Sequence, residues 1–350
     1  MGARVVGPEL LRVVLMGMII LHHLLVHGLN LKTAMASVAN SGEFLLLQIS
    51  LNALTVFAVN AFVLISGYFG VSYKTKSFVF LVLQGLAYTV LLMLIFRGMG
   101  YSGGGVIPTK YWFLLCFVSM YLLAPYINLA IGCISDRGVL VLVVMVAFLQ
   151  FIVGYLADHG IFGSGYSVQQ LLAIYVYGRA LNRYRLRLEK ISWKVMLVGF
   201  VVCWALVAGA ATILFLTSHP RWAWRMYSYD SPLVVLGAVC LFLISLKVTI
   251  QSEWIRSVSR HVFGVYLFHD NEYFSKYVIV ALVPVCVTNS GQMLLLFPGF
   301  VIGLMLIGMI VDIGISKILD VVLVNRFLKK VIEKIDSVVV PSQQQDISGK

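Results

Sequence analysis

The chain has 350 residues, of which 61% are hydrophobic and only 11% are Asp, Glu, Lys or Arg. Soluble domains carry about 25% charged residues, more than twice the fraction in this chain. Together with a mean hydropathy of +0.96, this low charge excludes a soluble single-core fold and predicts an integral membrane protein. The net charge of +12 does not indicate nucleic-acid binding, because the basic residues fall in alternate loops. The cysteines lie singly in apolar segments, so we interpret them as reduced packing residues.

The first apolar segment, residues 8–28, carries Arg12, His22, His23 and His27. As a helix it reaches across most of a bilayer. Arg12 and His23 are eleven residues apart, so they share one helix face and lie about 16 Å apart along the axis. His27 approximately shares that face, whereas His22 points elsewhere. Ionisable groups at membrane depth are costly and mark functional sites, although Arg12 could be a positive-inside anchor and His23 a helix–helix hydrogen bonder.

Ten apolar runs are long enough, or nearly so, to cross a membrane. They lie near 9–27, 44–66, 77–96, 111–132, 139–157, 168–181, 195–217, 232–250, 262–286 and 293–316. With loops assigned alternately, twenty of the 26 Lys and Arg residues fall on the N-terminal side and six on the other. This positive-inside bias predicts that both termini are cytoplasmic. The predicted fold is therefore all-α, with about ten transmembrane helices.

The ninth run, 262–286, is interrupted by the polar residues from His269 to Glu272. His269 follows Arg260 by nine residues, which places it about 13 Å from the cytoplasmic face, at a depth similar to that of His23. Because apolar residues bracket Asp270 on both sides, we expect a buried cavity that both imidazoles face. The alternative is an outward loop.

Other segments predict interfacial or packing features. Gly67, at the end of the second run, would allow either close approach of another helix or a turn, and Lys74 and Lys76 follow on the cytoplasmic side. The most basic cytoplasmic loop either anchors the chain on anionic lipid or recognises phosphate on a nucleotide-bearing donor. It contains Arg179, Arg183, Arg185, Arg187, Lys190 and Lys194.

The C-terminal region divides from the membrane domain, residues 1–316, near Lys317. Residues 318–336 have an apolar and a basic side, which predicts an amphipathic helix on the cytoplasmic membrane surface. A continuation of the last span is the alternative. The polar tail from Pro341 is expected to be disordered.

The Arg12-x10-His23 pattern resembles the signature of acyltransferase family three, the multi-spanning O-acyltransferases of cell-envelope glycans. Further segments are similar to that family over most of the chain. They are Ser-Gly-Tyr at 66–68, Trp-Phe at 112–113, Tyr-Leu-Leu-Ala-Pro at 121–125 and Phe-Gly-Val-Tyr-Leu-Phe-His at 263–269.

The resemblance implies transfer of an acyl group, most simply acetyl, from cytosolic acyl-CoA to a hydroxyl of an envelope or exported polysaccharide, in a bacterial inner membrane. His23 would deprotonate the hydroxyl or relay the acyl group as an acyl-imidazole. Arg12 would hold donor phosphate or the thioester carbonyl, and His269 and Asp270 would orient or assist the base. With Arg12, the basic residues Lys74, Lys76 and Arg183 are the candidate donor contacts.

We expect no metal, because the paired imidazoles of His23 and His27 lack a carboxylate or third ligand. The expected partners are acyl-CoA, a polysaccharide or lipid-linked glycan acceptor, and the bilayer. A transporter or flippase for a lipid-linked glycan is the competing function, in which Arg12 and the histidines would form a substrate or proton pathway. A glycan polymerase is disfavoured because the outward loops are short.

Overall fold

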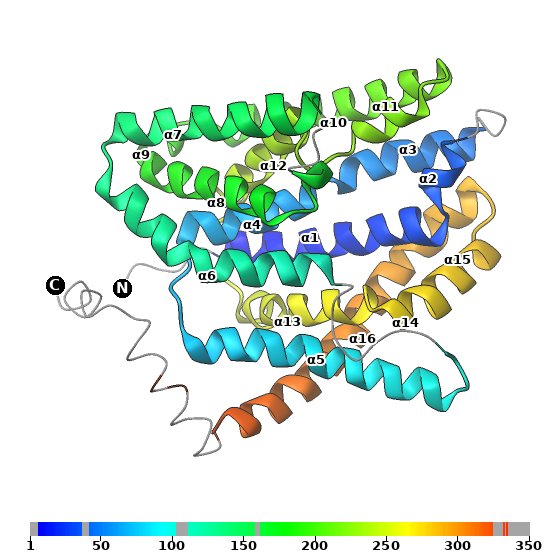
Figure 1. The fold of residues 1–350 in the computed structure, drawn as a ribbon. Coiled ribbons are helices and arrows are strands. Elements are labelled where there is room, and N and C mark those ends of the chain that lie inside the picture. The colour runs from blue at the N-terminus through cyan, green and yellow to red at the C-terminus, as the bar shows by residue number, and fades with distance from the viewer. Residues whose placement is uncertain are drawn as a thin grey trace.

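The computed structural model describes residues 6–36, 42–102, 111–157 and 162–324, together with residues 332 and 334. Every regular element within these residues is a helix, which confirms the all-α prediction (Figure 1). The first half contains α1 (Gly7–His23), η1 (Leu24–Gly28), α2 (Leu31–Ala34), α3 (Glu43–Thr55), α4 (Phe57–Phe69), α5 (Thr75–Gly98), α6 (Trp112–Cys133), α7 (Asp136–Phe148) and η3 (Leu149–Leu156). The second half contains η4 (Gly163–Gly165), α8 (Val168–Arg183), α9 (Arg185–Leu188), α10 (Trp193–Leu216), α11 (Pro220–Arg225), α12 (Pro232–Ser245), α13 (Glu253–His269), α14 (Glu272–Phe274), η5 (Ser275–Ile279), α15 (Val280–Cys286) and α16 (Ser290–Val324).

Seven helical segments in this part of the chain are long and apolar enough to cross a membrane. They are Gly7–Gly28, Glu43–Phe69, Thr75–Gly98, Trp112–Cys133, Asp136–Leu156, Trp193–Leu216 and Ser290–Leu323. The sixth and eighth predicted spans form helices of only 16 and 14 residues, α8 and α12. The ninth is divided at Asp270 between α13 and α14. The protein is thus a multi-pass membrane protein, and the number ten stays a prediction.

Local sequence signals set several helix starts. The Ser135, Ser167 and Ser252 side chains each accept a hydrogen bond from a backbone N–H in the first turn of α7, α8 and α13. Such caps satisfy donors that the helix itself leaves unpaired. Proline occupies the first turn of α1 and α12, where its missing N–H costs nothing.

Helix α1 lies in the middle of the bundle, in contact with α3, α4, α12, α13 and α16. In Figure 1, α1, α5 and α7 begin at the left, where α4 and α6 end and the basic helix α9 lies. The starts of α1 and α13 are joined by Glu9 and Arg256, whose Oε2 and Nε atoms are 3.6 Å apart. The two helices therefore begin at the same side and run in the same direction.

Close packing of α4 on α8 depends on two glycines, and for Gly67 it is one of the two roles that the sequence suggested. A Cβ atom on Gly67 would lie 2.5 Å from the backbone oxygen of Tyr175, and one on Gly178 would lie 2.7 Å from the backbone nitrogen of Tyr68. Neither contact leaves room for a side chain, so these glycines permit the close approach of the two helices.

A buried carboxylate joins α5, α13 and α16. Asp312 Oδ1 accepts hydrogen bonds from Gln84 Nε2 at 2.7 Å and from the Tyr88 hydroxyl at 3.1 Å. Its Oδ2 lies 2.8 Å from His261 Nδ1. A carboxylate inside a bilayer is tolerated when it is paired in this way. The cluster therefore fixes the middle of α13 against α5 and α16.

Helix α16 passes residue 317 without a break and continues to Val324. The first part of the predicted amphipathic segment is therefore a direct continuation of the last span. Most of the remainder of that segment, apart from residues 332 and 334, lies outside the described residues, as does the polar tail from Pro341.

Candidate active site

A cavity of about 230 Å³ lies beside the C-terminal end of α1. Its polar lining is concentrated on α1 and at the end of α13, and aromatic rings cover much of the rest. The lining residues are Met16, Ile19, His22, His23, Val26, His27, Thr55, Val59, Phe62, Trp112, Phe113, Tyr166, Tyr229, Phe263, Tyr266 and Asp270.

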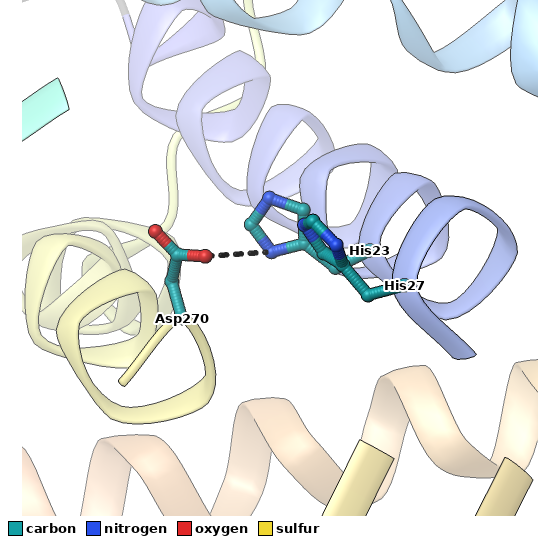
Figure 2. Close-up of side chains that lie close together, drawn as sticks. All are labelled: His23, His27 and Asp270. Atoms are coloured by element: carbon teal, nitrogen blue, oxygen red, sulfur yellow. Dashed lines mark ion pairs between the residues drawn. The ribbon is translucent and has the colours of Figure 1, made fainter. Parts of the chain in front are cut away.

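His23 and Asp270 form the polar centre of this cavity (Figure 2). His23 Nδ1 and Asp270 Oδ1 are 3.6 Å apart, with 11% and 14% of the two side chains exposed. Asp270 immediately follows the last residue of α13, and the side chains of His23 and His27 extend from α1 and η1 on the facing side. At this distance the two atoms are not hydrogen-bonded, and His23 Nδ1 has no hydrogen-bond partner among the residues that the structure describes. A carboxylate that moved slightly closer to Nδ1 would favour the imidazole tautomer that leaves the Nε2 lone pair available as a base.

His269 is fully buried beside the pair, with its ring centroid 5.0 Å from that of His23. Its Nδ1–H donates to the carbonyl of Val265 at 2.7 Å, so its Nε2 is left as an acceptor. That Nε2 atom has no hydrogen-bond partner among the residues that the structure describes. The structure thus brings His23, His269 and Asp270 together at one depth, as expected from the spacing, and buries His269 rather than exposing it in a loop.

The break after α13 is held by two side chains that the sequence did not single out for this purpose. Asn271 Nδ2 donates to the Tyr111 hydroxyl at 2.7 Å, and that hydroxyl donates to the carbonyl of Leu267 at 2.7 Å. Asn271 Oδ1 also accepts from the backbone nitrogen of Tyr273. These bonds satisfy polar groups freed by the interrupted helix, and they fix the backbone on both sides of Asp270.

His22 is turned toward α3, although its ring also forms part of the cavity wall. Its Nδ1 lies 2.8 Å from Asn52 Oδ1 and 3.2 Å from Thr55 Oγ1. These contacts fix the orientation of the His22 ring.

Nitrogen atoms of His23 and His27 and an oxygen of Asp270 all lie within 4.8 Å of one another. The sequence argued against a metal because no carboxylate lies near His23 and His27 in the first segment. The fold brings the Asp270 carboxylate beside them. Ligand atoms on a tetrahedral zinc ion lie roughly 3.3 Å apart, so the three side chains would have to move closer together to bind one. The expectation that the site needs no metal stays a prediction.

The basic candidates lie away from this cavity. Arg12 is half-buried and three turns earlier on α1. Lys74 and Lys76 are exposed at the start of α5, and the Arg183 Nε donates to Asp136 Oδ1 at 2.6 Å. None of these four lines the His23 cavity within the described chain, and their assignment to a donor stays a prediction.

The family model for an acyltransferase domain, acyltransferase 3, matches residues 5–313. The chain belongs to the acyltransferase 3 family. The match covers most of the chain, including α1, α13 and every cavity residue, so the protein is a membrane acyltransferase. Comparison with curated proteins and with solved structures gives no match.

The aromatic wall of the acyltransferase cavity was not apparent from the sequence. Trp112 and Tyr166 have ring centroids 4.6 Å apart, and Tyr166 lies 5.1 Å from Tyr229. These residues come from three segments that are far apart in the chain, so no local pattern reveals that they meet. Their rings form one side of the cavity that holds His23 and Asp270.

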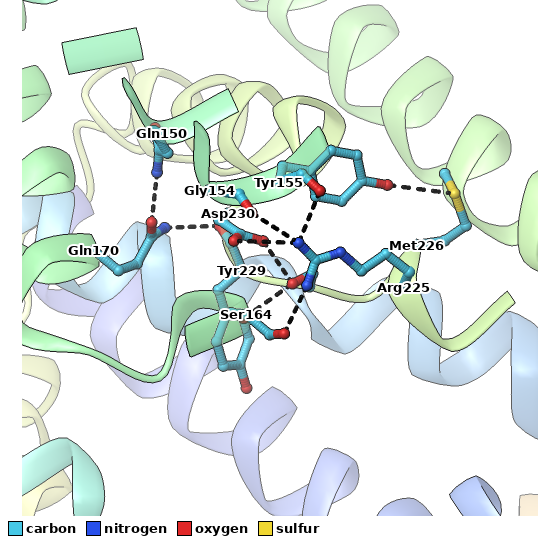
Figure 3. A network of polar contacts seen from close by, with 10 residues as sticks. Gln150, Gly154, Tyr155, Ser164, Gln170, Arg225, Met226, Tyr229 and Asp230 are labelled. Atoms are coloured by element: carbon cyan, nitrogen blue, oxygen red, sulfur yellow. Dashed lines mark hydrogen bonds and ion pairs between the residues drawn. The ribbon is translucent and has the colours of Figure 1, made fainter. Parts of the chain in front are cut away.

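A polar network behind this wall fixes Tyr229 (Figure 3). The carbonyl of Tyr229 accepts hydrogen bonds from Gln170 Nε2 at 2.7 Å and Asn60 Nδ2 at 2.8 Å. Gln150 Nε2 in turn donates to Gln170 Oε1 at 2.6 Å. The signal available in the sequence was the presence of amides inside three apolar spans, since such groups need partners in a membrane.

Proposed function

We propose that this acyltransferase moves an acyl group, most simply acetyl, from cytosolic acyl-CoA to a hydroxyl of a cell-envelope or exported polysaccharide. The observation that carries the proposal is the contact between His23 and Asp270 at a cavity inside the membrane. A sugar hydroxyl is a poor nucleophile, and transfer to it requires a base that functions near neutral pH. An imidazole with a carboxylate close to its Nδ1 atom is suited to that task.

In the proposed reaction the hydroxyl oxygen attacks the thioester carbonyl while His23 Nε2 takes the hydroxyl proton. Asp270 stabilises the resulting imidazolium through Nδ1. The tetrahedral intermediate collapses with cleavage of the carbon–sulfur bond, and the departing thiolate takes the proton from His23. The products are the O-acyl glycan and free CoA, and His23 is neutral again.

Arg12 suits the donor in this arrangement. It lies on the His23 face of α1 but near the end where the basic helix α9 also lies. A guanidinium there would hold donor phosphate, while the pantetheine arm would carry the thioester toward His23. We propose that this end faces the bacterial cytoplasm, because the excess of basic residues lies on that side.

His269 is assigned a supporting role. Its Nε2 has no partner among the described residues, and its ring packs against that of His23, although His269 is not among the residues that line the cavity. There it would help to orient the His23 ring.

The test is labelled acetyl transfer from acetyl-CoA into envelope polysaccharide, in cells with and without the protein. Label that appears only with the protein supports the proposal. If label does not enter the polysaccharide, while proteoliposomes containing the protein move a labelled lipid-linked glycan across the bilayer, the transporter function replaces it.

A further inference from the structure

A second hollow, of about 460 Å³, lies at the end of α1 opposite the N-terminus. Its lining combines aromatic rings with cations. The aromatic residues are Tyr166, Trp224 and Tyr227, and the cations are Lys32, Arg221 and Arg225. We call this hollow the vestibule.

The vestibule adjoins the cavity of His23. His22 and Tyr166 line both spaces, so two side chains form the wall that they share. His22 is adjacent in sequence to His23, and Tyr166 packs on the aromatic wall at Trp112 and Tyr229. A molecule bound in the vestibule therefore lies next to the group that we propose as the base, on the side away from Arg12.

The lining carries positive charge. Within the described chain, no Asp or Glu is among the residues that form the vestibule surface. Arg225 has a structural role there: its guanidinium donates to Ser164 Oγ at 2.7 Å and to the carbonyl of Gly154 at 3.0 Å, and lies 3.9 Å from buried Asp230 (Figure 3). The exposed side chains of Lys32 and Arg221 are the remaining cations.

The rings of the vestibule offer flat apolar faces beside that charge. Trp224 is half-buried, with its ring 5.6 Å from that of Tyr227, and the Tyr227 hydroxyl donates to the carbonyl of Ile49 at 3.0 Å. Lys32 Nζ lies 5.7 Å from the centroid of the Trp224 ring. A fixed ring beside a cation matches a sugar unit that has an apolar C–H face and a negatively charged substituent.

We propose that the vestibule binds the acceptor, and that this acceptor is an anionic glycan whose sugar units bear carboxylates. The inference rests on the proposed function, because it takes the glycan to be the substrate that receives the acyl group. Lys32 and Arg221 bind the carboxylates, Trp224 packs against a sugar ring, and the hydroxyl to be acylated passes His22 and Tyr166 to reach His23.

The test measures binding of short oligomers of galacturonate and of galactose, equal in length, to the full-length protein in nanodiscs. We expect the galacturonate oligomer to bind about tenfold more tightly, with a difference that shrinks as salt is added. The double variant Lys32→Gln/Arg221→Gln should lose about tenfold in affinity for galacturonate and little for galactose. Trp224→Ala should weaken both.

Lys276→Gln is the matched control, because Lys276 is an exposed cation that lies outside the vestibule lining. It should bind both oligomers as the unmodified protein does. Acetyl-CoA binding, measured on every variant, reports that the fold is intact. Equal binding of the two oligomers, or unchanged galacturonate affinity in the double variant, would overturn the inference.

The two proposals fail in different ways. If the protein prefers galacturonate but never consumes acetyl-CoA in its presence, the anionic site stands and the acyl-transfer proposal is wrong. If acetyl transfer proceeds onto neutral glycans and the vestibule does not discriminate charge, the inference about the acceptor is wrong and the proposed function stands. A competition experiment tests whether the vestibule instead recognises a lipid-linked pyrophosphate. If inorganic pyrophosphate binds the vestibule and the galacturonate oligomer does not, the assignment to carboxylates is overturned.

Discussion

His23 and Asp270 lie 3.6 Å apart at the ends of two helices that run in the same direction from a shared ionic contact. His23 follows Glu9 by fourteen residues, and Asp270 follows Arg256 by the same number. Fourteen residues make about four helical turns, or 21 Å. Because the spacing from the contact between Glu9 and Arg256 is equal on the two helices, His23 and Asp270 lie at one level.

Replacement of His23 tests the base directly. His23→Ala should lower acyl transfer about 10²- to 10⁴-fold, the usual effect of losing a general base, while acyl-CoA affinity stays nearly unchanged. Transfer is measured with labelled acetyl-CoA and purified protein. The control is His219→Ala, which removes an exposed histidine outside the cavity. Wild-type transfer by His23→Ala would contradict the catalytic role.

Asp270→Asn keeps the size of the side chain and removes its charge. Because the carboxylate stabilises the protonated form of His23 in the proposed reaction, we expect a fall in kcat of about ten- to a hundredfold, with little change in KM for the donor. Asp270→Glu should recover part of the loss. If the Asn variant lowers only the yield of folded protein, with normal kcat, Asp270 is a structural residue.

Arg12 should act on the donor rather than on the chemical step. Arg12→Ala removes a charge-assisted contact that contributes about 1.5–3 kcal/mol, so acyl-CoA affinity should fall about tenfold or more. Arg12→Lys should recover only part of it, because an ammonium lacks the planar fork of a guanidinium. Affinity is measured by calorimetry. An unchanged dissociation constant in Arg12→Ala would return Arg12 to the role of a membrane anchor.

The orientation in the membrane is testable with single cysteines in a background without the five natural ones. An impermeant thiol reagent added to intact cells should label exposed positions on the side away from the N-terminus. Those positions are Ser102, Ser218 and Asn289. Positions on the N-terminal side should react only after the membrane is opened. These are Ser72, Ser192 and Gln251. The opposite labelling pattern would place Arg12 on the wrong side for a cytosolic donor.

Gly67 should be intolerant of any side chain. A Cβ there would meet the backbone oxygen of Tyr175 at 2.5 Å, which backbone atoms cannot relieve without separating α4 from α8. We expect Gly67→Ala to lower the melting temperature and the yield of monodisperse protein. Gly303→Ala is the control, since the added methyl group would meet nothing within 4 Å. Equal melting temperatures of the two variants would contradict the packing.

Local sequence was sufficient for the properties that depend on neighbours in the chain. Apolar run length predicted a helical membrane protein, and helical periodicity placed Arg12 and His23 on one face. The sequence also indicated that Gly67 would allow either a close helix contact or a turn. These inferences need no knowledge of which helices are neighbours.

The sequence placed His23 and His269 at similar depths, but which side chains of distant segments make contact was decided by the tertiary structure. Asp270 is far from His23 in the chain, and their contact depends on the parallel packing of α1 and α13. The helix break at Asp270 depends on the Tyr111 hydroxyl, which donates to the carbonyl of Leu267 and accepts from Asn271 Nδ2. The cavity likewise needs Trp112, Tyr166 and Tyr229 to converge from three segments. Periodicity reports only the face on which a residue lies, whereas a catalytic pair also requires a partner helix at the same depth, and packing of the whole bundle selects that partner.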